Sequence, residues 1–383
     1  MNIWTDYKKI PLPDLLSFIV DNRGKTVPTA DDGNHILIAT NCIRNENLYP
    51  SYEKVRLLSE ETYQNWFRAH PVPGDIIFVC KGTPGRTCMV PDPIDFCIAQ
   101  DMIALRTNPA LIYNKFLLVV LRSKNIQEQI TNTSVGDVIP HFKKQFLDQL
   151  LIPVPPMEVQ RKIGDLYFSL ALKEELNKKI NENLLQQASS IYQAWFEDFV
   201  LSDGSCPPSW KQGSLADIAD ITSGKRPPVK SSEKTDTAVI PLVGAASVMG
   251  YTTEANHTDK ILVTGRVGTH GVVQRFNSPC WTSDNTLVIT SDLYEYTFQI
   301  LQRIDYRAMN RGSTQPLITQ GDMNKVPILI PDKETLLSFE ALVGQLMEQY
   351  QANILENNKL AELRDTLLPR LMSGELDVSE LEL

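Results

Sequence analysis

Long hydrophobic runs are absent from this sequence: no eighteen consecutive residues are apolar, whereas a membrane-spanning α-helix needs about 20. The first residues, MNIWTDYKKI, have the pattern of neither a signal peptide nor a transit peptide. Six cysteines occur among 383 residues, but none belongs to a CxxC pair or has a histidine at a zinc-binding spacing. We therefore expect a cytoplasmic protein that has reduced structural thiols, no metal site and no membrane partner.

Catalytic and cofactor-binding motifs are also missing. A DNA adenine methyltransferase needs a motif such as NPPY or DPPF to hold the flipped base, but the Pro-Pro pairs here read VPPM, CPPS and RPPV. Neither a G-x-G-x-x-G loop nor a G-x-x-x-x-G-K-S/T loop is present to cradle a phosphate, and the five histidines include no HExxH pair. The sequence therefore predicts a protein that is not an enzyme, with no catalytic residues and no cofactor.

The net charge of −9 argues at first against nucleic acid, because contacts with phosphates need lysine and arginine. The charge is unevenly distributed. Lys and Arg against Asp and Glu number 16 and 16 in residues 1–155, 5 and 8 in 156–204, 12 and 11 in 205–330, and 4 and 11 in 331–383. The acidic excess thus lies in the second and fourth segments. The first and third segments are nearly neutral, and each could carry a basic face.

The stretch from Met157 to about Phe199 predicts one long helix. Prolines in IPVPP open it, as the first helical turn tolerates, and the next proline is Pro207. Apolar residues recur at steps of three and four, interrupted at Lys173 and Asn177, which is typical of a coiled-coil seam. The expected seam residues are Ile163, Leu166, Leu170, Ile180, Leu184, Ile191 and Ala194.

A second stretch, from about Lys333 to Leu368, matches the first without a gap when Pro155 is placed on Pro331. Both the apolar positions and the polar interruptions of the two seams then coincide. A buried asparagine in such a seam costs stability but fixes register and partner, so the match indicates two helices that pair with each other. The asparagines that we expect to set the register are Asn177, Asn181, Asn353 and Asn357.

The segments that precede the two helices share landmarks in the same order, which indicates one unit of roughly 180 residues that occurs twice. Short apolar runs at 35–39, 75–80 and 102–106 predict strands, and residues 10–19 and 114–123 predict short helices. The matched landmarks are GTPG (Gly82 to Gly85) with GTHG (Gly268 to Gly271), GKTVP (Gly24 to Pro28) with GKRPP (Gly224 to Pro228), Cys97 and Asp101 with Cys280 and Asp284, and TSVGDVI (Thr133 to Ile139) with GSTQPLI (Gly312 to Ile318).

Two repeats ending in mutually paired helices predict an α+β fold. We expect two mixed α/β domains separated by two long helices that pair as an antiparallel coiled coil, with an internal pseudo-two-fold repeat. The expected segments are a first domain (1–155), a first long helix (156–204), a second domain (205–330), and a second long helix with a C-terminal tail (331–383). A helix of about 43 residues is about 65 Å long, so the helices would act as a spacer.

Three motifs accompany this duplication: IPVPPMEVQRKI at the entry to the first helix, GSTQPLI followed by ILIP, and the closing LLPRLMSGEL (Leu367 to Leu376). In order, spacing and duplication, essentially the whole chain resembles the specificity subunit of type I restriction–modification systems. The entry to the second helix departs from the pattern, because PDKETLLSF stands where the first helix has PPMEVQRKI.

The resemblance implies that each domain is a target-recognition domain that reads one half of a split, asymmetric target in double-stranded DNA. Two rigid readers at a fixed separation specify two half-sites with an unread spacer. The resemblance also implies partners that carry out catalysis. These are two adenine-N6 methyltransferase subunits docked along the helices and, in the full complex, two ATP-dependent restriction subunits that translocate and cleave DNA.

Candidate DNA contacts lie in loops rich in Gly and Pro, where long cations can extend and hydroxyl or amide groups can meet phosphates and base edges. The alternative for each is an ordinary solvated loop residue or helix cap. Asp101 and Asp284 are expected to hold turns through backbone hydrogen bonds. The candidates are Arg23, Lys25, Lys81, Thr83 and Arg86 in the first domain, and Lys225, Arg226, Arg266, Thr269, His270, Arg311, Ser313, Thr314 and Gln315 in the second.

Two other functions stay open at this stage. The chain could be a coiled-coil scaffold whose globular ends bind proteins, or a self-contained DNA-modifying enzyme with unrecognised motifs. Methyl transfer from S-adenosylmethionine to DNA without added subunits would identify the enzyme. A methyltransferase-bound chain that shows no DNA selectivity would identify the scaffold.

Overall fold

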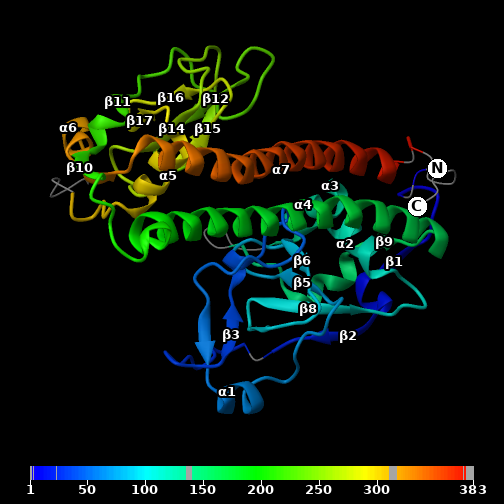
Figure 1. Ribbon diagram of the computed structural model, residues 1–383. Helices are drawn as coiled ribbons and strands as arrows, with labels where there is room; N and C mark the ends of the chain where they lie inside the picture. The colour runs from blue at the N-terminus through cyan, green and yellow to red at the C-terminus, as the bar shows by residue number, and fades with distance from the viewer. Residues whose placement is uncertain are drawn as a thin grey trace. The chain divides into compact units, whose positions relative to one another are not determined.

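The computed structural model describes residues 2, 4–22, 24–134, 140–309, 317–373 and 375–376. The chain divides into two compact units: the first comprises Met1–Lys179 and Asn353–Leu383, and the second comprises Ile180–Ala352. The divisions fall inside the two long helices, α4 (Met157–Tyr192) and α7 (Lys333–Ser373), drawn in green and in orange to red in Figure 1. Each unit therefore combines a globular part with a segment of both helices.

Within its described residues, the globular part of the first unit is built on three small sheets. The strands are β1 (Lys9–Pro11), β2 (Leu16–Val20), β3 (His35–Ile38), β4 (Arg56–Leu58), β5 (Ile76–Val79), β6 (Thr87–Met89), β7 (Phe96–Ile98), β8 (Met102–Thr107) and β9 (Leu151–Pro153). One sheet has the antiparallel order β2-β8-β5-β6, and β1 pairs with β9. In the order β4-β3-β7, β3 is antiparallel to β4 and parallel to β7.

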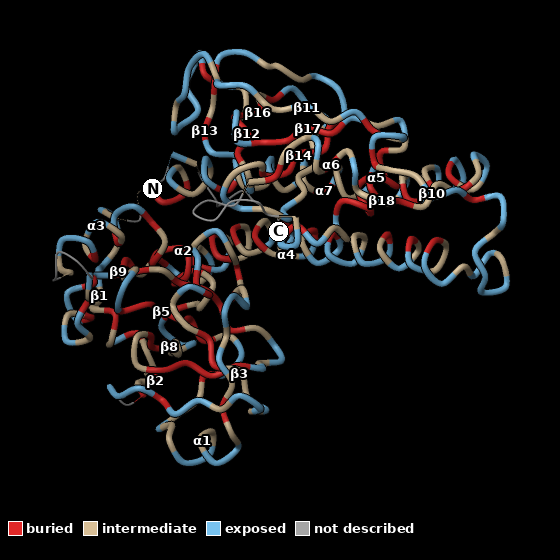
Figure 2. The backbone as a smooth tube through the Cα atoms, turned by 90° about the vertical axis from the view of Figure 1, so that its left-hand side faces the viewer, coloured by how far each residue is buried: buried red, intermediate tan, exposed pale blue. Residues whose placement is uncertain are grey.

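The core of the first unit lies around a buried helix. The helices are α1 (Glu60–Asn65), α2 (Asn114–Arg122) and α3 (Lys124–Thr133), with 3-10 turns at Leu12–Leu15, Thr40–Cys42 and Lys144–Gln149. Six consecutive α2 residues, 116–121, are fully buried against side chains of β5 and β8, which Figure 2 shows in red. Leu371 and Met372 join the same core, so the C-terminal end of α7 belongs to this unit.

The expected strands at 35–39, 75–80 and 102–106 and the helix at 114–123 are confirmed. The expected helix at residues 10–19 is wrong. This segment forms β1, a 3-10 turn and β2, because residues 16–20 pair with β8 and their backbone groups bond across the sheet instead of along a helix.

The second unit repeats this arrangement of sheets. Its strands are β10 (Lys211–Ser214), β11 (Asp220–Ser223), β12 (Ile240–Val243), β13 (Val248–Thr252), β14 (Ile261–Gly265), β15 (Gln274–Phe276), β16 (Trp281–Thr282), β17 (Thr286–Thr290) and β18 (Pro327–Ile330). The orders are β11-β17-β14-β15, β13-β12-β16 and β10-β18, and β12 is again antiparallel to one neighbour and parallel to the other. The predicted internal repeat is therefore confirmed in the sheet topology.

Two helices of the first unit, α1 and α3, have no counterpart among the described residues of the second. The helices there are α5 (Tyr294–Arg303) and α6 (Gln320–Asn324), with 3-10 turns at Val200–Ser202 and Leu215–Asp217. Whereas α3 follows α2 after one residue, residues 304–309 after α5 form no helix. The two units therefore differ beside the matched turns, because, among the described residues, α3 is present only in the first.

The long helices follow the predicted lengths closely, but their buried stripe is displaced. Helix α4 continues into a π-helical turn at Gln193–Glu197, and α7 runs past Leu368 through Pro369. Ile180, expected in the seam, is 45% exposed. The stripe shifts because α4 packs on the globular cores as well as on α7, so its most buried residues face both partners. Its buried members are Gln160, Ile163, Tyr167, Ala171, Glu174, Asn177, Asn181, Ala188 and Tyr192. No helix of the described residues is long and apolar enough to cross a bilayer.

Candidate nucleic-acid interface

The GTPG turn of the first unit connects β5 to β6 in a tight hairpin. Gly82 and Gly85 have φ of +84° and +88°, a left-handed conformation that L side chains rarely adopt. The Gly82 N–H donates to the Pro140 carbonyl at 2.9 Å, and the Phe142 N–H donates to the Cys80 carbonyl at 2.8 Å. The turn therefore lies beside the segment that immediately follows residues 135–139.

The GTHG turn of the second unit, between β14 and β15, is held in the same way. Gly268 and Gly271 have φ of +84° and +82°. The Ile318 N–H donates to the Arg266 carbonyl at 3.0 Å, as Phe142 does to Cys80 in the first unit. In each unit, the GTxG turn thus lies beside the end of the polar loop. Both segments are landmarks that the sequence repeat shares.

Side chains of the first turn are available for an external ligand. Lys81 is exposed, and Thr83 and Arg86 are half-buried. None of these three side chains makes a hydrogen bond or ion pair in the described structure. Because the turn backbone is fixed by hydrogen bonds, the three side chains project from a defined frame.

The second turn leaves buried polar atoms without partners. Thr269 is exposed, while Arg266 and His270 are half-buried. His270 Nδ1 lies 3.1 Å from the Gly265 carbonyl oxygen, but His270 Nε2 and Arg266 Nε are buried and have no hydrogen-bond partner among the described residues. A buried polar group without a partner costs free energy, so a ligand that accepts from Arg266 Nε or donates to His270 Nε2 would supply the missing hydrogen bond.

The other candidate cations lie in different surroundings. Lys25, Lys225 and Arg226 are exposed, and Arg226 Nε is 3.8 Å from Asp284 Oδ2. Nothing described lies within 4 Å of a Cβ placed on Gly24, whereas one on Gly224 would collide with the Ser283 carbonyl oxygen, so the two GK sequences do not occupy equivalent places. Arg23, Arg311, Ser313, Thr314 and Gln315 lie outside the described residues.

The two aspartates matched by sequence do not occupy equivalent positions in the structure: the residue equivalent to Asp101 is Asn285, one after Asp284. The Cys80 N–H donates to the Asp101 carbonyl, and the equivalent Arg266 N–H donates to the Asn285 carbonyl. Asp101 thus holds a turn through its backbone, as expected. Asp284 has the side-chain contact with Arg226 instead.

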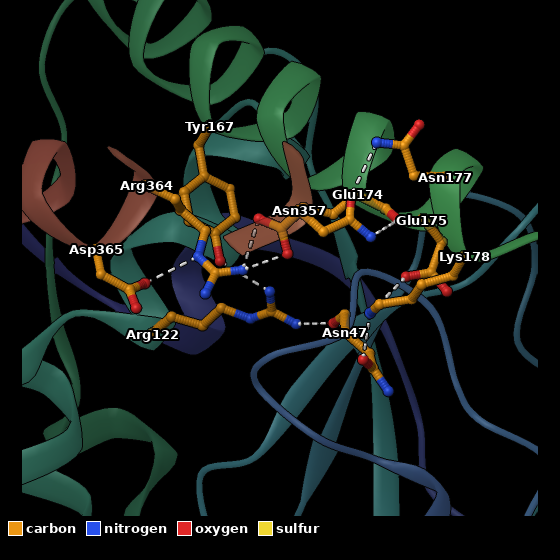
Figure 3. A network of polar contacts seen from close by, with 10 residues as sticks. All are labelled: Asn47, Arg122, Tyr167, Glu174, Glu175, Asn177, Lys178, Asn357, Arg364 and Asp365. Atoms are coloured by element: carbon orange, nitrogen blue, oxygen red, sulfur yellow. Dashed lines mark hydrogen bonds and ion pairs between the residues drawn. The ribbon is translucent and has the colours of Figure 1, made fainter. Parts of the chain in front are cut away.

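The asparagines expected to set the helix register are buried between α4 and α7, except for the half-buried Asn357. In the first unit, Asn177 Nδ2 donates to Asn357 Oδ1 at 2.9 Å and to Glu356 Oε2 at 2.7 Å (Figure 3 draws Asn177 and Asn357). In the second unit, Asn181 Nδ2 donates to the Tyr350 carbonyl at 3.1 Å. Asn353 is 4% exposed. Residue numbers rise on α4 as they fall on α7, so within each unit the two segments run in opposite directions.

A buried ion pair adjoins these asparagines in the first unit. Arg364 Nη1 lies 3.1 and 3.2 Å from the carboxylate oxygens of Glu174, and the two side chains are only 9% and 7% exposed. Arg364 Nε also donates to Asp365. Burial raises the pKa of Glu174 above its ordinary value, and the charge of Arg364 opposes that rise. Sequence reasoning missed this pair because it sought only apolar residues and asparagine in the seam.

Arg122 joins the globular part of the first unit to α4. Its guanidinium donates to the carbonyls of Asn47 and Thr87 at 2.7 and 2.6 Å and to the Tyr167 hydroxyl at 2.9 Å. Lys178 Nζ donates to Asn47 Oδ1 at 2.8 Å. Figure 3 shows Arg122, Asn47 and Lys178 close together. Through the Thr87 carbonyl, Arg122 also connects β6, the strand that leaves the GTPG turn, to Tyr167 on α4.

Two units with one sheet topology and one type of glycine turn define a duplicated mixed α/β protein that presents two matched turns. A family model described as the type I restriction modification DNA specificity domain matches residues 6–186 and 207–365, once for each repeat, and the chain belongs to this family. Such proteins are the non-catalytic specificity subunits of type I restriction–modification systems, in which partner subunits carry out catalysis. The predicted family and DNA-specificity role are confirmed.

Similar proteins support this membership. The HindI specificity subunit of Haemophilus influenzae is 23% identical over 398 residues, covering 79% of this chain and 86% of the relative. The MjaIX specificity subunit of Methanocaldococcus jannaschii is 27% identical over 310 residues, covering 70% and 71%. The crystal structure of a type I S subunit from M. genitalium has a TM-score of 0.58 with 18% identity and 96% of each chain covered, which supports the fold.

Proposed function

We propose that this specificity subunit reads a bipartite, asymmetric target in double-stranded DNA, with the domain of residues 1–155 on one half-site and the domain of residues 205–330 on the other. The observation that carries the proposal is the matched pair of glycine turns. Their backbones are held alike, but they present Lys81, Thr83 and Arg86 in one unit and Arg266, Thr269 and His270 in the other. A shared frame with different side chains is what two different half-sequences require.

The long helices are proposed to pair as one antiparallel coiled coil and to set the number of unread base pairs between the half-sites. The Asn177–Asn357 contact and the buried Glu174–Arg364 pair support a fixed register, because a shifted register would leave buried polar groups unpaired. Two adenine-N6 methyltransferase subunits dock along the helices in this proposal. Two ATP-dependent restriction subunits complete the assembly.

Binding selection tests the proposal directly. The full chain, purified with its methyltransferase partner, is incubated with a duplex library containing a long randomised window, and bound DNA is sequenced. We expect enrichment of two short, different half-sequences at one fixed spacing. Enrichment of a single continuous sequence, or of none, would contradict the proposal. Methyl transfer to DNA by the chain without any partner would show instead that it is an enzyme.

A further inference from the structure

A glutamine outside the candidate interface forms a hydrogen bond with the GTPG turn of the first unit. Gln127, on α3, donates from Nε2 to the Gly85 carbonyl at 2.9 Å and to the Leu121 carbonyl at 2.7 Å. A Cβ on Gly85 would lie 3.0 Å from Gln127 Oε1, so the turn and the amide are in close contact. Gln127 thereby connects the turn to the C-terminal end of the buried helix α2.

Other hydrogen bonds fix the turn at both of its ends. The Gly82 N–H donates to the Pro140 carbonyl, and the Thr87 N–H donates to Asn45 Oδ1 at 2.9 Å. Arg122 donates to the Thr87 carbonyl. Between Thr83 and Arg86 the turn has three backbone hydrogen bonds: the Gly85 N–H donates to the Val79 carbonyl, the Val79 N–H to the Arg86 carbonyl, and the Arg86 N–H to the Thr83 carbonyl. Gln127 adds the side-chain hydrogen bond to this part of the turn, at the Gly85 carbonyl.

The second unit solves the same problem differently. No described segment there corresponds to α3, and the GTHG turn has His270 Nδ1 beside the Gly265 carbonyl oxygen. The side chain of His270 thus contacts the Gly265 carbonyl, which corresponds to Val79, and not the Gly271 carbonyl that would correspond to Gly85. Any positioning effect of Gln127 should consequently be confined to the first unit.

We propose that Gln127 is a positioning residue for DNA recognition by the first domain. It holds the turn in one conformation, so that Thr83 and Arg86 meet the DNA without first losing backbone freedom. A loop already fixed in its binding conformation gives tighter and more selective binding, because the ordering cost does not have to be met on association. This inference rests on the proposed function and assigns a role to a residue that need not touch DNA.

Substitution of the amide tests the inference. Gln127→Met keeps the approximate volume but removes the donor, and Gln127→Glu places a carboxylate against two carbonyl oxygens. Gln129→Met is the matched control, because Gln129 lies on the same helix and its amide donates to Asn125 one turn earlier. Ile126 and Ile130 anchor α3 in the core and are left intact. Each full-length variant is purified with the methyltransferase partner and applied to the randomised duplex library.

We expect Gln127→Met to lower discrimination at one half-site about fivefold, as loss of one net hydrogen bond implies, and Gln127→Glu to lower it further. The other half-site and the spacing should stay as in the wild type and in Gln129→Met, and the melting temperature should fall only slightly, because the Gly85 and Leu121 carbonyls lose a donor. Equal loss at both half-sites together with a lower melting temperature would show a merely structural role and overturn the inference. A wild-type profile for both Gln127 variants would overturn it while leaving the proposed function intact. Failure of the wild type to enrich a bipartite sequence would overturn both.

Discussion

Shortening both long helices by one heptad should shorten the spacer in the DNA target and leave the half-sequences unchanged. Residues 180–186 of α4 and 346–352 of α7 are suitable, because their removal deletes the Asn181–Tyr350 contact but keeps Asn177–Asn357 and the Tyr192–Phe339 ring contact. Seven residues rise about 10.5 Å at 1.5 Å each and change the helical phase by only about 20°. At 3.4 Å per base pair, this corresponds to a loss of up to about three base pairs.

The assay is selection from the randomised duplex library, compared between the wild type and the double deletion. Deletion of either heptad alone is the control, because helices of unequal length cannot keep both sets of retained contacts, and we expect weak binding with no sharp spacing. An unchanged spacer in the double deletion, or altered half-sequences with the original spacing, would refute the idea that the helices measure the gap.

Substitutions at three further places have defined outcomes. Arg364→Met should lower the free energy of unfolding of the first unit by about 3–5 kcal/mol, since it leaves the Glu174 carboxylate buried and unpaired, while the double variant with Glu174→Leu should recover most of the loss. Burial holds the pKa of Glu174 in the folded state above its value in the unfolded state, so the free energy of unfolding falls as the pH rises between these two values. Loss of Arg364 raises the folded-state pKa of Glu174 further, so the stability difference between Arg364→Met and the wild type should shrink as the pH is lowered. Urea titrations followed by hydrogen exchange measure this difference. Arg266→Ala should lower the discrimination between correct and incorrect bases at one half-site by about 1–3 kcal/mol, measured by competition binding. An equal loss of affinity for all sequences would indicate a phosphate contact instead. Asn177→Leu combined with Asn357→Leu should raise the melting temperature but broaden the selected spacing, and unchanged spacing would show that these asparagines do not set the register.

The duplication, the two long helices and the paired loops could be predicted because they depend on spacing along the chain. The turns could be predicted because a positive φ favours glycine, and this conformation occurs at Gly82, Gly85, Gly268 and Gly271. The gapless match between the two helices is visible because both obey one packing period. Such local regularities survive the sequence divergence of the domains.

Contacts between distant segments could not be predicted in the same way. Glu174 and Arg364 look like solvated helix residues until the fold buries both side chains, leaving them 7% and 9% exposed. Gln127 acts across the fold on Gly85, and the described part of the second repeat has no equivalent that would draw attention to it. Ile180 was placed in the seam because a two-helix period ignores the globular core that also packs on α4.

The most direct test of divided recognition is replacement of residues 205–330 by the corresponding domain of another specificity subunit, followed by genome-wide mapping of methylated adenines in the host. The parent chain and a deletion of its gene provide the references. We predict that one half-sequence is exchanged while the other half-sequence and the spacing persist. Exchange of both half-sequences, or retention of both, would contradict the assignment of one domain to each half-site.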